Sequence, residues 1–171
     1  AELLIENFAN KTSNIQFSIV RFGNVMGSSG SALPKFSEQI IQGRYVTLTH
    51  PDMERYFMSI EEAAFLVVGT TTSADISLSG NFRCYLLDMG KPKKIIDVIS
   101  ELAKLAGKKL VENAIYKDDV EILITGLRPG EKLYEELSHS GKTIQTEISS
   151  IYRIDNGVSS NFDIEEELAN V

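Results

Sequence analysis

Apolar residues along this chain alternate between short unbroken runs and stretches with helical spacing. The first run, residues 15–22, is rich in β-branched and aromatic side chains and ends at Gly23. It predicts a strand that is buried in a parallel sheet. A helix with one apolar face follows, with Pro34 at its start and Gly43 at its end. The apolar positions of that face are Leu33, Phe36, Ile40 and Ile41.

The same alternation continues through the middle of the chain. Residues 46–49 predict a short strand, and the sequence SIEE at residues 59–62 predicts a capping box at the start of the next helix. The apolar run at residues 82–87 predicts a second buried strand, and residues 95–106 predict a helix that Gly107 ends. Strands and helices in alternation are typical of an α/β sheet fold, and a length of 171 residues favours one domain.

The two ends of the chain are less regular than its middle. Residues 1–10 have helical spacing from the first position, which is Ala1 rather than Met, so we expect a piece of a longer protein. Near the other end, residues 148–154 predict an edge strand, and residues 162–169 predict a short acidic helix.

Composition narrows the class of function. The chain has 17 Lys and Arg against 24 Asp and Glu, so its net charge of −7 offers no general attraction to nucleic acid or to an anionic membrane. Any bound anion must therefore be held by a local site. The single cysteine, Cys84, excludes a disulfide framework and fits a reducing cytoplasm. No apolar stretch approaches the ~20 residues of a membrane span.

The segment Gly126–Lys132, with the sequence GLRPGEK, combines residue types that hold an anion. The planar guanidinium of Arg128 can grip two phosphate oxygens at once. Pro129 sets the bend of the backbone, and Gly130 lets the backbone come close to a bound group. The segment therefore predicts a site for a phosphorylated small molecule. A structural alternative is that Arg128 only pairs with Glu131 at the start of a helix.

Two other polar residues stand in settings that suit a ligand. Asn24 lies in a glycine-rich loop, residues 23–31, whose glycine spacing is not that of the dinucleotide motif G-x-G-x-x-G. At the carboxyl edge of a parallel strand its amide can donate to a phosphate or sugar oxygen, although a plain connecting loop stays open. Arg55 follows a turn, where its alternative role is a surface ion pair with Asp52 or Glu54.

Other reaction chemistries have little support. The two histidines, His50 and His139, lie far apart without partners at metal-ligand spacing, so no metal site is predicted. No G-x-S-x-G motif occurs, and no histidine base can be tied to the serines of the glycine-rich loop. We therefore assign no catalytic residue to this chain.

Four ordered segments resemble motifs of one known family. They are residues 20–31, 49–58, 87–92 and 126–137. Together they are similar to the polysaccharide biosynthesis nucleotide-sugar dehydratases, extended short-chain dehydrogenase/reductases typified by UDP-N-acetylglucosamine 4,6-dehydratase. The resemblance covers residues 1–137 and fades beyond them. It implies an α/β fold, with the remnant of a Rossmann-like parallel sheet and a substrate-binding subdomain, followed by a C-terminal tail, residues 138–171.

The resemblance also implies how a nucleotide sugar is bound. Asn24 would contact the diphosphate of the sugar nucleotide, and Arg55 and Arg128 would neutralise its charge. Glu131 would orient Arg128 or bind a ribose hydroxyl. The residues implied to enclose the uracil are Ser31, Leu33, Val46 and Leu48, although Lys35 departs from the family pattern beside them.

In such enzymes the cofactor is held mainly by a part that precedes this chain. The resemblance implies that this N-terminal part, absent here, binds NAD or NADP and supplies a catalytic lysine, while Phe22 and Gly23 lie near the nicotinamide. No tyrosine in this chain is followed four residues later by a lysine, the proton-transfer pair of short-chain dehydrogenases. The chain alone should be inactive. The parent enzyme is expected to be a cytoplasmic homo-oligomer, and a membrane anchor upstream is left open.

Three functions remain open from the sequence. The first is the UDP-N-acetylhexosamine-binding half of a nucleotide-sugar 4,6-dehydratase. The second is a fragment of a UDP-sugar C4 or C5 epimerase, because the same substrate clamp serves both reactions and the deciding groups lie upstream. The third is a non-catalytic nucleotide-binding or assembly module, which would bind UDP without any partner.

Overall fold

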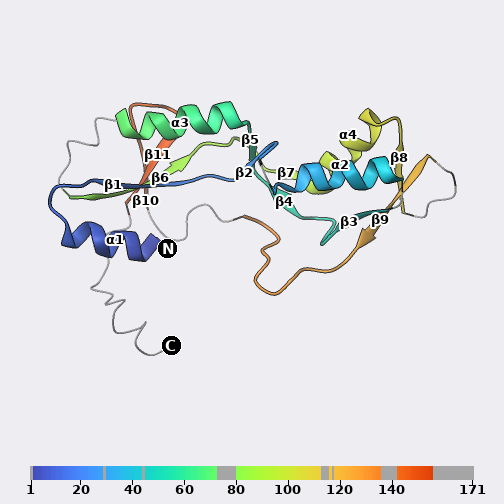
Figure 1. Ribbon diagram of the computed structural model, residues 1–171, viewed down its shortest axis with the longest axis horizontal. Coiled ribbons are helices and arrows are strands. Elements are labelled where there is room, and N and C mark those ends of the chain that lie inside the picture. Colours follow the sequence, from blue (N-terminus) through green and yellow to red (C-terminus); the bar gives the residue numbers. More distant parts are fainter. Residues whose placement is uncertain are drawn as a thin grey trace. The chain divides into compact units, whose positions relative to one another are not determined.

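The computed structural model describes residues 2–28, 30–43, 45–72, 80–112, 116, 118–135 and 142–155. The chain divides into two compact units (Figure 1). Unit 1 consists of Ala1–Phe22, Ala63–Asp88 and Leu137–Val171, and unit 2 of Gly23–Glu62 and Met89–Glu136. The chain crosses between the units several times and contributes to a separate core in each, whereas the length alone favours one domain.

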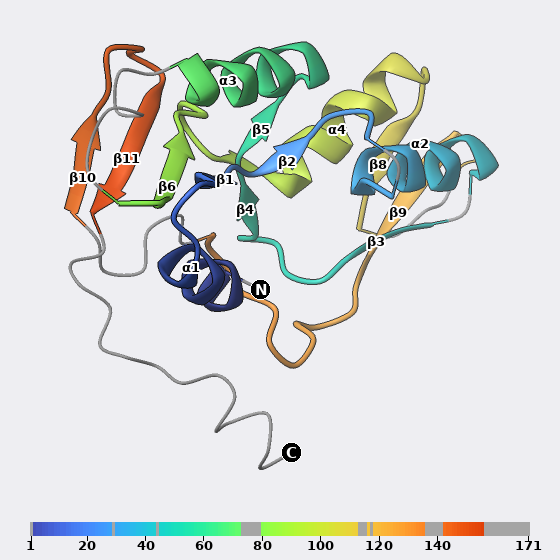
Figure 2. The same cartoon turned by 60° about the vertical axis from the view of Figure 1, so that its left-hand side comes forward.

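Unit 1 is built on a four-stranded sheet with the order β1-β6-β11-β10. Strand β1 (Phe17–Arg21) runs parallel to β6 (Phe82–Leu87), which confirms both predicted strands and their parallel arrangement. Strand β11 (Ile151–Asp155) is antiparallel to β6 and to β10 (Lys142–Gln145). Figure 2 shows the hairpin of β10 and β11, in orange, beside β6.

Two predictions for this sheet need correction. The strand predicted at the edge, residues 148–154, is β11, which lies between β6 and β10 and is therefore internal. Its partner β10 forms the edge, and the sequence KTIQ gives little apolar signal for a strand. The strand expected to be buried, β1, is only half-buried, since it has one neighbouring strand among the described residues. The helix predicted at residues 162–169 lies outside the described residues.

Two helices belong wholly or mostly to unit 1. Helix α1 (Glu2–Lys11) confirms the predicted first helix, and the Glu2 carboxylate accepts a hydrogen bond of 2.9 Å from Nε of Arg21 on β1. Helix α3 (Ile60–Thr72) starts as predicted, with the Ser59 hydroxyl accepting a hydrogen bond of 3.0 Å from the backbone N–H of Glu62. This hydrogen bond satisfies one of the free amides at the helix start.

Unit 2 contains a three-stranded parallel sheet covered by two helices. Its strand order is β3 (Tyr45–Leu48), β9 (Asp119–Ile124) and β8 (Lys109–Val111). The helices α2 (Ala32–Gln42) and α4 (Ile95–Leu105) contact each other and the sheet. Figure 1 shows both helices on the same side of this sheet. The predicted strand at residues 46–49 and both predicted helices are thus confirmed. Most of their predicted ends agree with the structure to within about one residue.

The buried core of unit 2 lies between these helices and the sheet. It contains nine buried side chains: Phe36, Ile40, Val46, Leu48, Met53, Ile95, Ile99, Ala103 and Val120. The prediction that Ile41 lies on the apolar face of α2 is wrong, because its side chain is 72% exposed. Gly43 ends α2 as predicted, in a left-handed conformation with φ of 70° that favours glycine.

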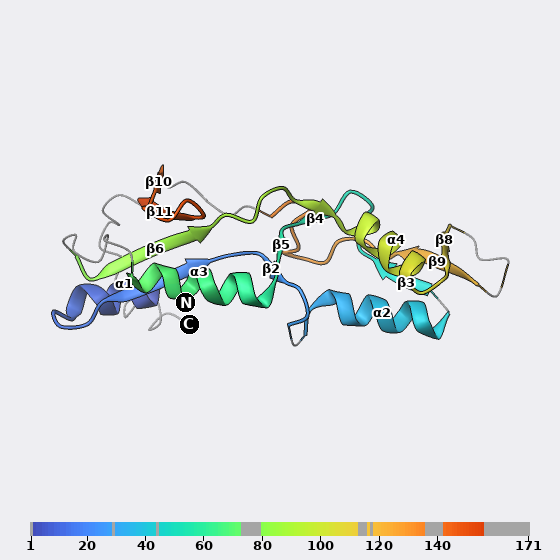
Figure 3. The same ribbon diagram turned by 90° about the horizontal axis from the view of Figure 1, so that it is seen from above.

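Two short strand pairs complete unit 2. Strand β2 (Asn24–Val25) runs parallel to β5 (Phe57–Met58), and Figure 3 shows the two segments next to each other. Strand β4 (Glu54–Arg55) is antiparallel to β7 (Lys93–Lys94). In the described part of the chain, no helix is both long and apolar enough to cross a membrane.

The thiol of Cys84 should be chemically inert in the folded chain. It is 3% exposed in the core of unit 1, and burial raises the pKa of this thiol because the thiolate would lose its hydration. We expect almost no reaction with a disulfide reagent at pH 8, and complete reaction of one thiol in denaturant. The absorbance of the thiolate that the reagent releases measures the reaction under native and under denaturing conditions. Rapid reaction under native conditions would show that strand β6, which carries Cys84, is not buried.

Candidate functional site

Unit 2 contains a pocket of about 630 Å³, within the range of small-molecule sites. Five residues predicted to bind a substrate are among those that line it. They are Asn24, Leu48, Arg55, Arg128 and Glu131. Residues far apart in the sequence therefore share one pocket.

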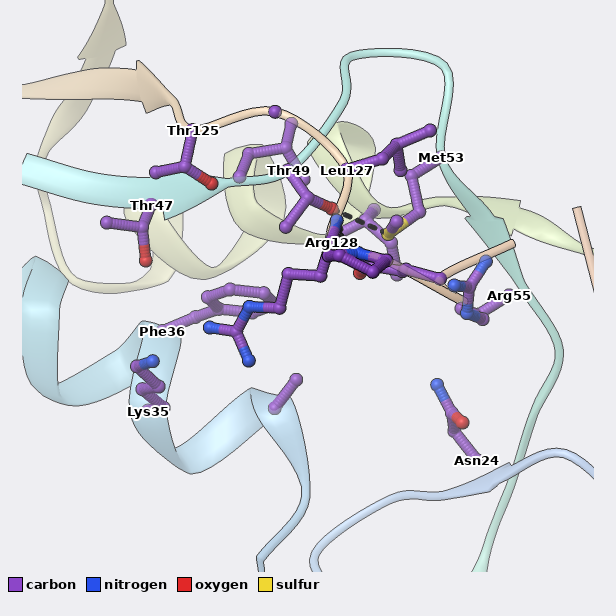
Figure 4. A pocket seen from close by; sticks show the side chains of 16 residues that line it. Asn24, Lys35, Phe36, Thr47, Thr49, Met53, Arg55, Thr125, Leu127 and Arg128 are labelled. Carbon is purple, nitrogen blue, oxygen red and sulfur yellow. Dashed lines mark hydrogen bonds between the residues drawn. The ribbon is translucent and has the colours of Figure 1, made fainter. Parts of the chain in front are cut away.

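Strand pairing brings Asn24 and Arg55 to the same end of the pocket. In the pair of β2 and β5, Asn24 is in register with Phe57, only two residues beyond Arg55. The backbone N–H of Asn24 also donates to the Tyr56 carbonyl at 2.9 Å. Figure 4 shows the Asn24 amide directed toward Arg55. This is the carboxyl edge of a strand, where the sequence predicts a ligand contact.

Arg128 enters the pocket from residues 126–133, which we call the arginine loop. Figure 4 shows its side chain extending toward Phe36 and Lys35 of α2. Among the described residues its guanidinium has no hydrogen-bond or ionic partner, and the residue is exposed. Its donors are therefore available to a ligand.

The carboxylate of Glu131 anchors the arginine loop. One oxygen accepts a hydrogen bond of 3.0 Å from the backbone N–H of Arg128, and the other accepts one of 3.1 Å from the Thr49 hydroxyl. The backbone N–H of Glu131 in turn donates to the Arg128 carbonyl at 2.9 Å. The structure therefore differs from the predicted alternative of an Arg128–Glu131 side-chain pair: Glu131 holds the backbone of Arg128 and leaves its guanidinium unoccupied.

Arg55 is bound to the backbone rather than to an acidic side chain. Its Nη1 donates to the carbonyls of Glu54 and Leu133 at 2.7 and 3.1 Å, and its Nη2 donates to the Lys132 carbonyl at 2.7 Å. The alternative of a surface ion pair with Asp52 is not what the structure has, since that carboxylate pairs with Lys94 at 3.1 Å.

The residues expected around a uracil are only partly in the lining. Leu48 lines the pocket, whereas Ser31, Leu33 and Val46 do not. Val46 is fully buried in the core, and Leu33 packs against that core. The hydroxyl oxygen of Ser31 is buried without a hydrogen-bond partner in the described structure. A role of these three residues at a uracil stays a prediction.

Several lining residues were not predicted from the sequence. Thr49 and Thr125 directly follow the adjacent parallel strands β3 and β9, and the Thr125 N–H donates to the Leu48 carbonyl at 2.9 Å. Their position after two parallel strands is a signal that could have identified them. Lys35 and Phe36 line the pocket from the first turns of α2, and no spacing rule marks them in the sequence.

The lining is positively charged although the whole chain is acidic. It holds the cations Lys35, Arg55 and Arg128, and Glu131 is the one carboxylate among the described lining residues. Each oxygen of Glu131 accepts one hydrogen bond from the protein, from the Thr49 hydroxyl and from the Arg128 N–H. The arrangement suits the binding of an anion rather than a reaction on it.

The predicted cofactor contacts, Phe22 and Gly23, fall at the boundary of the two units. A Cβ at position 23 would lie 2.9 Å from Sδ of Met89 and from Cβ of Tyr56. Glycine is therefore required there by packing within the protein, which gives no sign of a cofactor. The proximity of Phe22 and Gly23 to a nicotinamide stays a prediction.

The family model of polysaccharide biosynthesis proteins matches residues 1–156. The chain belongs to this family. It is 41% identical to the capsular polysaccharide biosynthesis protein CapD of Staphylococcus aureus, over 99% of this chain and 27% of that protein. The chain thus spans about a quarter of the length of this curated relative. The predicted family is confirmed, and the match extends 19 residues beyond residue 137 (156 against 137).

Solved structures confirm the predicted α/β fold. The X-ray structure of Pen from Bacillus thuringiensis is similar with a TM-score of 0.69 and 26% identity, over 95% of this chain and 46% of that one. A UDP-N-acetylglucosamine 4-epimerase from Methanobrevibacter ruminantium M1, in complex with UDP-N-acetylmuramic acid, is similar with a TM-score of 0.54 and 20% identity. That match covers 76% of this chain and 39% of the epimerase, and it concerns the fold alone.

The anchor of the arginine loop can be tested by its effect on stability. Thr49→Val keeps the shape of the side chain but removes the hydroxyl that donates to Glu131. We expect a loss of about 1 kcal/mol in the free energy of unfolding, the usual size for one hydrogen bond at a half-exposed site. Thr125→Val is the matched control, because no side-chain hydrogen bond of Thr125 exists among the described residues. Urea unfolding measures the free energy of unfolding of both variants. An equal loss in Thr49→Val and Thr125→Val would contradict the anchoring role of the Thr49 hydroxyl.

Proposed function

We propose that this chain is the UDP-sugar-binding half of a nucleotide-sugar 4,6-dehydratase in surface polysaccharide or glycan biosynthesis. One observation carries the proposal: the exposed guanidinium of Arg128, which has no partner among the described residues, shares a pocket with Asn24 and Arg55. Family membership supports the pathway, and the relative CapD is a capsular polysaccharide biosynthesis protein.

The diphosphate of the substrate accounts best for this arrangement. Its negative charge would be neutralised by Arg128 and by the donors of Arg55 that the backbone does not use. The Asn24 amide would donate to a phosphate or sugar oxygen at the same end of the pocket. In a partly dehydrated pocket such charge-assisted hydrogen bonds are stronger than in open water.

The nucleoside would then extend toward the start of α2. Ser31 and Leu33 precede and begin that helix, and Val46 and Leu48 lie on the neighbouring strand β3. We assign the uracil to this end, where Phe36 and Leu48 add apolar surface to the lining. Glu131 would orient Arg128 through the backbone N–H of that residue, and its oxygens keep lone pairs that could accept a ribose hydroxyl.

The role of the chain in the reaction is to hold the substrate in place. A 4,6-dehydratase removes water across C5 and C6 of the hexose after transient oxidation at C4, and NAD or NADP would supply that oxidation when bound by an upstream part. The residues of this chain would hold and orient the UDP-sugar for that step. Positioning of a reactant can supply up to ~7–11 kcal/mol of the barrier.

A fragment of a UDP-sugar C4 or C5 epimerase is the second candidate. Similarity to the UDP-glucose 4-epimerase of Rickettsia canadensis, 31% identical over 80% of this chain and 36% of that protein, favours it. The same diphosphate clamp would serve that reaction. Product analysis of the complete enzyme separates the two: a 4-keto-6-deoxy sugar marks a dehydratase, and an inverted sugar that keeps its C6 hydroxyl marks an epimerase.

An autonomous binding module is the third candidate. It requires that this chain alone binds UDP, which calorimetry would detect as heat of binding. A cytoplasmic homo-oligomer stays our expectation for the complete enzyme.

Arg128 should dominate substrate affinity. In the complete enzyme, Arg128→Ala should weaken binding of the UDP-sugar by roughly 2–5 kcal/mol, the usual cost of removing one partner of a desolvated charge pair. Lys91→Ala is the control, because Lys91 is an exposed cation of unit 2 outside the pocket. Steady-state kinetics gives the Michaelis constants. The same value for the Arg128 variant and the wild type would refute the clamp.

The isolated chain should not form product. Purified residues 1–171 incubated with UDP-N-acetylglucosamine and either NAD or NADP should yield no 4-keto sugar, since we assign no catalytic group to this chain. Mass spectrometry of the nucleotide sugar detects a loss of 18 Da on dehydration, which roughly equals one water, and the complete enzyme serves as the positive control. A 4-keto product from the chain alone would disprove the division of labour.

A further inference from the structure

We propose that Arg55 has two simultaneous functions, anchoring the arginine loop with one edge of its guanidinium and binding the anion with the other. Arg55 would thereby position Arg128. The inference deepens the proposed function and rests on it for the identity of the anion. The anchoring half rests only on hydrogen bonds within unit 2.

The donors of Arg55 divide into two sets. An arginine side chain carries five N–H donors in a planar fork. Three are used, by the carbonyls of Glu54, Lys132 and Leu133, and all three come from Nη1 and Nη2. Among the described residues, two donors are left without a partner, one on Nε and one on Nη2. These neighbouring nitrogens can donate to two oxygens of one phosphate.

The anchored carbonyls belong to the segment that carries Arg128. Leu133 is held twice, because its carbonyl also accepts a hydrogen bond of 3.2 Å from the backbone N–H of Glu54. Next to Lys132, the Glu131 carboxylate accepts hydrogen bonds from the Thr49 hydroxyl and from the backbone N–H of Arg128. Two neighbouring anchors therefore hold the loop directly after Arg128, and both are made by residues that line the pocket.

Lysine cannot replace arginine in this role. An ammonium group has three donors on one nitrogen, which cannot reach three backbone carbonyls and two phosphate oxygens together. Arg55→Lys therefore keeps the charge and loses the double function. Arg128→Lys is the matched comparison, because Arg128 makes no side-chain hydrogen bond to the described protein and its substitution leaves both anchors intact.

Hydrogen exchange of the complete enzyme without ligand tests the anchor. In Arg55→Lys, the hydrogen-bonded amides at positions 128 and 131 should exchange at least about tenfold faster than in the wild type. In Arg128→Lys they should exchange at the wild-type rate. Amides of α4, in the same unit as the loop, report unfolding of unit 2 and should be unchanged in both variants. Unchanged exchange of the loop in Arg55→Lys would overturn the proposal. Thr49→Val, which releases the other anchor and leaves Arg55 in place, should also accelerate exchange of the loop.

Affinity for UDP tests whether the anchor positions Arg128. Each single lysine variant should raise the dissociation constant by some factor. If the two arginines act together, the factor for the double variant should be smaller than the product of the two single factors, by about fivefold or more. A factor equal to the product would mean independent contacts and would overturn the positioning role. If the wild-type enzyme binds no UDP, the proposed function fails, while the exchange experiment still decides on the anchor.

Discussion

The hydrogen bonds from Arg55 to the carbonyls of Lys132 and Leu133 connect segments 77 and 78 residues apart in the sequence. The rest of the pocket depends on this connection. It keeps the arginine loop beside strands β3 and β4, so that Arg128 projects into the same space as Asn24. Backbone carbonyls have no charge to neutralise Arg55, and its two unused donors therefore keep their attraction for an anion.

Local structure would let an acidic chain bind the proposed diphosphate. The net charge of −7 opposes any long-range attraction, and salt screens exposed charges beyond about 8 Å in the cell. On this proposal, affinity comes from short contacts of the ligand with Arg55 and Arg128. The hydrogen bonds of Glu131 matter for the same reason, because they use the only carboxylate of the described lining for holding the backbone.

Most elements of the fold could be predicted because their signals are local. The glycine at position 43 and the serine at position 59 mark helix ends through backbone geometry and a single hydrogen bond, so neighbouring residues suffice to identify them. Strand β10 was missed because its pairing with β11, rather than an apolar pattern, makes it a strand. The burial of Ile41 was misjudged for a similar reason, since spacing gives a helical face but not its exact width.

The sequence by itself determined the family, the α/β class, and the chemical types available for binding: two arginines and an amide in recognisable motifs. It could not determine which donors were already in use, because that depends on atoms brought together from distant segments. Only the tertiary structure decided that Arg55 donates to backbone carbonyls, that Glu131 holds the backbone of Arg128, and that no described residue pairs with the Arg128 guanidinium. Hydrogen bonds depend on distance and angle in space, and these arise only when the segments pack.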